Sequence, residues 1–150
     1  MKTLSATLLL ALATLSLPSF ADNDMAIAQP WTRATAPGAP AAGYMTILNR
    51  TGKADNLLDV SGSFAKRVEL HQSLSVDGVM KMVHQREGVR IPAGGELVLK
   101  PGGYHLMFMA LAKPFVVGET YSVKLGFERA GVIEVVLPVM AFEHGTEMAH

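Results

Sequence analysis

The sequence predicts an all-β domain, and three observations support this fold class. Strong helical periodicity is missing after the first twenty or so residues, which rules out a helical bundle. Short runs rich in Val, Leu, Thr, Tyr and Phe alternate with Gly, Pro, Asn and Asp, a pattern typical of β-sandwiches and barrels. The chain contains no cysteine, so we expect its stability to come from packing rather than from disulfides.

Each expected strand is a run of β-branched, aromatic or other apolar residues that is bounded by turn-forming residues. In chain order the expected strands are 26–32, 43–48, 55–61, 66–72, 79–84, 96–99, 105–110, 120–127 and 132–139. The segment 34–42 contains two prolines and is expected to be a loop. The segment 49–55 is rich in turn-forming residues and is expected to connect two strands.

The first residues have the features of a secretory signal peptide. Lys2 supplies the positive start, residues 8–17 form a short apolar stretch, and residues 19–21 give a small-x-small cleavage site. Pro18 ends the apolar stretch too early for a membrane-spanning helix, which needs about 20 residues. We therefore expect residues 1–21 to be removed and the mature protein to lie in the periplasm.

The mature chain is expected to begin at Asp22 and to form one domain, 22–141, followed by a loosely ordered polar tail, 142–150. No cysteine follows the cleavage site, so we expect no lipid anchor and no membrane insertion of the mature chain. The 13 basic residues balance the 13 acidic residues. This balance argues against nucleic acid or an anionic membrane as a partner, because either would favour a basic surface.

Asp77 and Gly78 give the clearest turn signal, because an Asp-Gly pair favours a tight β-hairpin. With this pair at the centre of the turn, His71 faces His84 and Met82 lies diagonally across from His71. Diagonal neighbours on one face lie within reach of long side chains. A slip of one residue would place them on opposite faces, so this inference depends on the register.

The turn-forming run 100–104 precedes a strand that carries a second group of candidate residues. Along this strand His105, Met107 and Met109 share one face. The opposite face is apolar and is expected to point into the core; it comprises Leu106, Phe108 and Ala110. The face with histidine and methionine is therefore free to line a site.

Imidazole and thioether without thiolate suit Cu(I) better than zinc, calcium or magnesium. Methionine sulfur is neutral and polarisable, so it binds Cu(I) without holding it as tightly as thiolate would. The absence of cysteine excludes zinc-thiolate sites and the blue-copper centre. Two imidazoles and two thioethers would hold Cu(I) and still release it to an acceptor with thiolates, which suits transport better than catalysis.

Packing is the competing explanation for the methionines, because methionine commonly fills cores. It accounts most simply for the methionines that lie in apolar runs: Met45, Met107, Met109 and Met140. The occurrence of two such groups in one small domain favours a metal site over packing. One group is a His-x-Met pair on one strand, and the other is a histidine with two methionines on one face of a hairpin.

These residues resemble the motif of the PCu(A)C family of periplasmic copper chaperones, which is a histidine, a later methionine and then a His-x-Met. Ten residues separate the first two positions here, and twenty-two separate Met82 from His105. The runs 78–82 and 100–109 also match the family. The resemblance assigns four Cu(I) ligands: His71, Met82, His105 and Met107.

The resemblance implies a cupredoxin-like Greek-key β-sandwich that carries Cu(I) and is not an enzyme. The implied partner is a copper-acceptor protein, such as the copper centre of cytochrome c oxidase or another copper chaperone. Met80 and Met109 are expected to lie in the core or just behind the ligands, and His84 to flank the site. Only the spacing and the family pattern favour Met82 over Met80.

Two other functions remain open. One is a periplasmic adhesion or assembly sandwich without metal, in which histidine and methionine only pack. The other is a copper redox enzyme, which would need an open coordination position that four ligands do not leave. The tail contains His144, Met148 and His150. We expect these residues to belong to a solvated chain end, and the alternative is a weak auxiliary Cu(II) site.

Overall fold

The computed structural model describes residues 25–141 and confirms an all-β chain, with ten strands and no helix in this part of the sequence. The strands are β1 Met25–Arg33, β2 Ala41–Asn49, β3 Asp55–Ser61, β4 Ala65–Val76, β5 Val79–His84, β6 Val89–Ile91, β7 Glu96–Leu99, β8 Tyr104–Leu111, β9 Thr120–Phe127 and β10 Gly131–Met140. The expected signal peptide, the mature start at Asp22 and the candidate tail site lie outside the described residues. No helix within residues 25–141 has the length and apolarity needed to cross a membrane.

All nine strands expected from the sequence are present, and three findings differ from the expectation. Strand β2 begins at Ala41, inside the expected loop 34–42, because Ala41 and Ala42 pair with Phe108 and Met107 of β8. Strand β4 continues past residue 72 to Val76, because it pairs with β5 up to the turn at Asp77 and Gly78. Strand β6 was not predicted. It has only three residues and is defined by its pairing with β3, so its sequence alone carries little signal.

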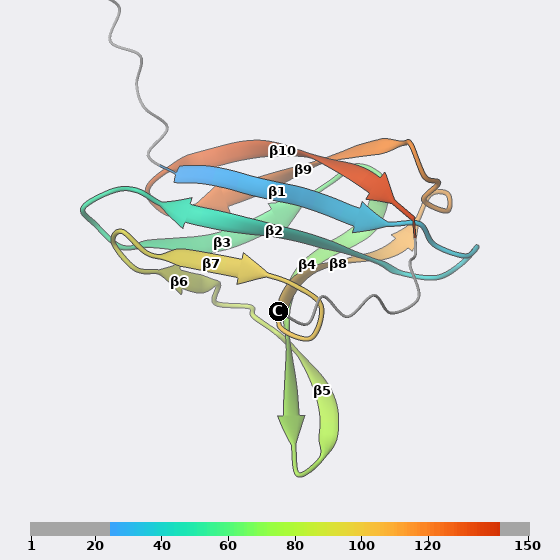
Figure 1. Cartoon of the computed structure of the whole chain (residues 1–150), viewed down its shortest axis with the longest axis horizontal. Helices are drawn as coiled ribbons and strands as arrows, with labels where there is room; N and C mark the ends of the chain where they lie inside the picture. Colours follow the sequence, from blue (N-terminus) through green and yellow to red (C-terminus); the bar gives the residue numbers. More distant parts are fainter. Residues whose placement is uncertain (1–24, 142–150) are drawn as a thin grey trace, which may run out of the picture.

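The ten strands form one hydrogen-bonded sheet in the order β5-β4-β8-β7-β2-β1-β10-β9-β3-β6 (Figure 1). Most neighbours are antiparallel, and β1–β10 and β7–β8 are parallel. Strands β3 and β4 stand far apart in this order and yet contact each other. The sheet therefore curls on itself and encloses a core between its two halves.

The core receives side chains from both halves of the sheet, among them Ile47, Leu57, Phe108 and Leu125, all inaccessible to solvent. Burial of each such side chain contributes about 1.5–3 kcal/mol. Leu106 and Phe108 are fully buried, which confirms the predicted core face of β8. Ala110 is exposed, so its expected core position is wrong: its φ of +53° takes the end of the strand out of the regular alternation.

Asn49, at the end of β2, is a buried polar residue with 1% of its surface exposed. Its Nδ2 donates hydrogen bonds to the carbonyl oxygens of Lys53, Ile91 and Pro92, at 2.8, 3.2 and 3.1 Å. The side chain thus closes the expected turn after β2 and fixes the end of β6 against it. A buried carbonyl that loses its donor has no water to replace it.

We predict that Asn49→Ala lowers the free energy of unfolding by about 1–3 kcal/mol, because it removes the side-chain donor to the buried carbonyl of Ile91 and to the partly buried carbonyl of Pro92. The measurement is urea unfolding at neutral pH. Asn56→Ala is the matched control, since Asn56 bonds Glu128 at an exposed position and its removal should cost about 0.5 kcal/mol or less. Equal losses for the two variants would contradict this assignment.

Candidate metal centre

Three neighbouring strands place three histidines in one row across the sheet. In the order β5-β4-β8, His84 lies opposite His71, and His71 lies opposite His105. Residues directly opposite each other point to the same face, so the imidazoles are neighbours. The centroid of the His71 ring lies 5.3 Å from that of the His84 ring and 5.9 Å from that of the His105 ring. The hairpin register predicted from Asp77 and Gly78 is confirmed.

Two methionines join this face from the flanking strands. Met82 lies opposite Ser73, and Met107 lies opposite Glu69. Both partners are two residues from His71 on β4 and therefore share its face. A hollow of about 250 Å³ lies here, and three of the four predicted ligands line it: Met82, His105 and Met107. His71 is not among the lining residues and lies beside the hollow, next to His105.

The hollow is open on the hairpin side and deep on the β8 side. Met82 is 62% exposed, on the part of the β4–β5 hairpin that projects from the rest of the sheet (Figure 1). His105 is only 4% exposed. Tyr44 and Ser73 are among the other residues that line the hollow. A small ion could therefore bind first to the exposed thioether of Met82 and then reach the buried imidazole of His105.

His105 has one ring nitrogen engaged and one available. Its Nδ1 lies 3.1 Å from the carbonyl oxygen of Gly103, which can only accept a hydrogen bond. Nδ1 therefore carries the proton in the neutral ring, and Nε2 carries the lone pair. This is the tautomer in which a histidine binds a metal through Nε2 while a backbone carbonyl orients the ring.

His71 shows the same division of roles with the nitrogens exchanged. Its Nε2 lies 2.8 Å from Oε2 of Glu69, so Nε2–H donates to the carboxylate. Its Nδ1 is buried and has no hydrogen-bond partner among the described residues. An unsatisfied buried polar atom costs about 1–3 kcal/mol and calls for an explanation. A free nitrogen lone pair opposite a carboxylate-bound N–H is the arrangement common to metal-binding histidines.

Glu69 is the residue of this centre that sequence reasoning missed. The hydrogen bond from His71 lowers the pKa of Glu69, partly opposed by desolvation, and the charges of His84 and Arg67 lower it further. Glu69 therefore stays ionised and holds the His71 ring. The available signal was the Glu-x-His spacing on one strand, which places both side chains on one face.

Of the two other methionines near this face, Met80 differs in position from the expectation. Met80 lies opposite Ser75 on the face of Met82, but it is as exposed as Met82, so it is not in the core. Met109 is half-buried, and its sulfur accepts a contact from Nη2 of Arg67 at 3.1 Å.

The packing explanation holds for only some of the methionines. Met45 is buried in the core, as that explanation predicts. Met140 is half-exposed, so packing does not account for it. Met107 is partly buried and lines the hollow.

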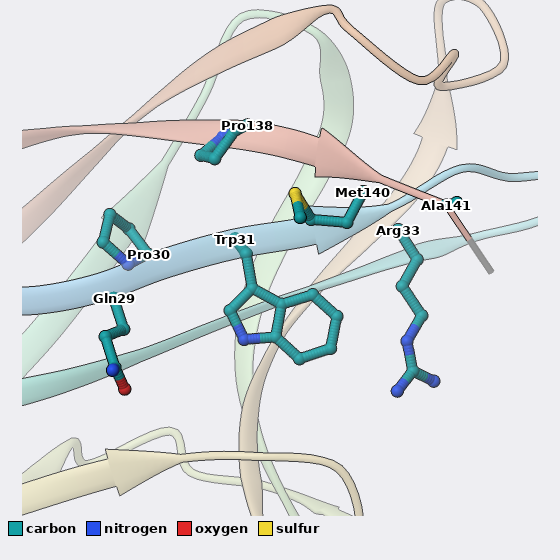
Figure 2. Close-up of a pocket in the computed structure, with 7 residues that line it drawn as sticks. All are labelled: Gln29, Pro30, Trp31, Arg33, Pro138, Met140 and Ala141. Carbon is teal, nitrogen blue, oxygen red and sulfur yellow. The ribbon is translucent and has the colours of Figure 1, made fainter. Parts of the chain in front are cut away.

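A larger hollow of about 710 Å³ lies elsewhere, between β1 and the end of β10 (Figure 2). Arg33 places its guanidinium 5.0 Å from the centre of the Trp31 ring, a favourable cation–π arrangement. The remaining lining residues are Gln29, Pro30, Pro138, Met140 and Ala141. Neither imidazole nor carboxylate lines it, so its donors suit a metal less well than those of the smaller hollow.

Solved structures similar to this chain include copper-binding domains. The copper-bound PCuAC domain from PmoF2 is 25% identical, with a TM-score of 0.64, covering 79% of this chain and 93% of that one. The Cu(I) form of DR1885 from Deinococcus radiodurans is 28% identical, with a TM-score of 0.55, covering 75% of this chain and 77% of that one. The apo form of DR1885 is 25% identical, with a TM-score of 0.61, and covers 94% of each chain. The described fold is therefore PCuAC-like.

Two curated relatives extend the comparison. "Putative lipoprotein Lxx21020" from Leifsonia xyli is 30% identical over 135 residues, which is 90% of this chain and 81% of that protein. "Uncharacterized protein RP573" from Rickettsia prowazekii is 27% identical over 104 residues, 67% of this chain and 58% of that protein. The family model described as "Putative lipoprotein LpqE-like" matches residues 25–139, which is most of the sequence. The chain therefore belongs to the LpqE-like family.

Proposed function

We propose that this protein is a copper chaperone that binds one Cu(I) and delivers it to an acceptor protein. The proposed ligands are the thioethers of Met82 and Met107 and imidazole nitrogens of His71 and His105. One observation carries the proposal: both thioethers and His105 line one hollow, and His71 lies beside it with a buried nitrogen that no residue of 25–141 hydrogen-bonds. The copper-bound state of the structural neighbours supports the same cargo.

The donor chemistry favours the monovalent ion. Thioether sulfur is soft and uncharged, and Cu(I) accepts such donors together with imidazole. The ring orientations are fixed in advance, since Gly103 accepts from His105 and Glu69 accepts from His71. A preorganised pair of imidazoles reduces the ordering cost of binding.

The exposure of Met82 explains how copper could leave the site. Its sulfur lies on a projecting hairpin, where an incoming thiolate could replace one ligand at a time. The proposed acceptor is the copper centre of cytochrome c oxidase or another copper chaperone, and the proposed location is the periplasm. The lipoprotein description of the family supports an extracytoplasmic location, and the PCuAC-like relatives point to a non-enzyme. We also propose that the fold is a cupredoxin-like Greek-key β-sandwich.

A metal-free adhesion or assembly role fits the centre less well. In such a protein a buried imidazole nitrogen is expected to have a hydrogen-bond partner, and Nδ1 of His71 has none in the part of the chain that the structure describes. A redox enzyme fits less well because four ligands would leave no position for substrate.

We predict that Met82→Leu and Met107→Leu each weaken Cu(I) binding about tenfold or more, because each removes one sulfur donor and conserves volume. The measurement is anaerobic competition against a chromogenic Cu(I) chelator. Met80→Leu is the matched control, because Met80 has the same strand, face and exposure as Met82 but does not line the hollow. Equal effects at positions 80 and 82 would show that the hollow does not define the site.

We also predict that Cu(I) affinity falls as the pH is lowered from 7.5 to 5, since protons compete with Cu(I) for the imidazole nitrogens. Each imidazole ligand that exchanges a proton for Cu(I) should add up to about a tenfold loss per pH unit, while thioether sulfur exchanges no proton. His105→Ala keeps one imidazole, so its affinity should fall about half as steeply on a logarithmic scale. An affinity that does not change between pH 7.5 and pH 5 would exclude two histidine ligands.

A further inference from the structure

A second set of donors lies on the same face of the sheet and comes from the two strands of the hairpin, β4 and β5. Glu69, His71 and His84 each offer one ligand atom, and these atoms lie within 4.8 Å of one another. Oε2 of Glu69 is 2.8 Å from Nε2 of His71 and 3.4 Å from Nδ1 of His84. Both imidazoles therefore converge on one carboxylate oxygen.

These separations match the spacing of donors around a divalent ion. Imidazole nitrogen and carboxylate oxygen bind first-row divalent ions at about 2.0–2.2 Å, so donors at right angles lie about 3 Å apart and opposed donors about 4 Å apart. The two distances to Glu69 fit adjacent donors. The limit of 4.8 Å between the imidazoles leaves room for opposed donors.

We propose that Glu69, His71 and His84 form a second copper site, which takes Cu(II). Nitrogen and oxygen donors in a tetragonal arrangement suit Cu(II), and among divalent first-row ions such donors bind Cu(II) most tightly. Two of the site's three donors, Glu69 and His84, are not proposed ligands of Cu(I). Its existence therefore does not depend on Cu(I) binding.

The surroundings leave this cluster accessible to an ion. Arg67 approaches the carboxylate at Oε1, 3.8 Å from its Nε, whereas the imidazoles face Oε2. Arg67 is mostly exposed and can turn away, and His84 is partly exposed. An ion can thus enter from solvent without unfolding the hairpin.

His71 belongs to both sites through different nitrogens. Its Nε2 faces Glu69, and its buried Nδ1 is the nitrogen available to Cu(I). A neutral imidazole has only one unprotonated nitrogen, so the neutral ring serves one site at a time. The protein can therefore hold copper in either oxidation state around a shared ring.

The test is titration of the purified apo protein with Cu(II), followed by electron paramagnetic resonance. The parent protein should bind one Cu(II) with hyperfine coupling from two imidazole nitrogens. His84→Gln should weaken Cu(II) binding about tenfold or more and remove one nitrogen coupling, and Glu69→Gln should also weaken it. Circular dichroism checks that each variant is folded.

Two control variants make each outcome decisive. The double variant Met82→Leu, Met107→Leu should keep the Cu(II) spectrum and lose Cu(I) binding. If the parent protein binds Cu(II) but does not bind Cu(I), only the chaperone proposal is refuted. The double variant His144→Gln, His150→Gln should leave the Cu(II) spectrum unchanged. The proposal is overturned if the spectrum survives in His84→Gln, or if it depends on the thioethers or on these two histidines.

Discussion

The pairing register of β5, β4 and β8 is the constraint on which the centre depends. Side chains alternate between faces with a period of two, so a slip of one residue on β5 would move Met82 and His84 to the opposite face. The turn fixes that register, because Asp77 and Gly78 both adopt positive φ, +51° and +76°. Two central residues with positive φ are the requirement of the tight hairpin turn that matches strand twist.

Packing of the core fixes β8, the strand that carries His105 and Met107. Leu106 and Phe108 point inward from β8, which turns His105 and Met107 toward the hollow. Gly43 on β2 pairs with Leu106, and a Cβ there would lie 2.7 Å from the Phe108 ring. The close approach of backbone and ring thus holds β8 firmly. The centre combines a rigid imidazole on β8 with an exposed thioether on a projecting hairpin, which suits a site that must both hold and release an ion.

Local sequence rules predicted what depends on local geometry. The turn residues and alternation gave the hairpin register and the bounds of β3 and β5, and the His/Met spacing identified residues that the structure brings to one region. Features that depend on tertiary contacts were not predictable. Strand β6 exists through its partner, Glu69 gains its role from the ring of His71, and the exposure of Met80 follows from how far the hairpin projects.

X-ray absorption spectroscopy of the Cu(I)-loaded protein tests the central claim most directly, because it identifies the atoms bound to copper. Two thioethers and the imidazole of His105 line one hollow, with His71 beside it, and this arrangement predicts a first coordination shell that contains both sulfur and nitrogen, in about equal numbers. A shell of nitrogen and oxygen alone would contradict the account, since it would mean that Met82 and Met107 only pack against the site.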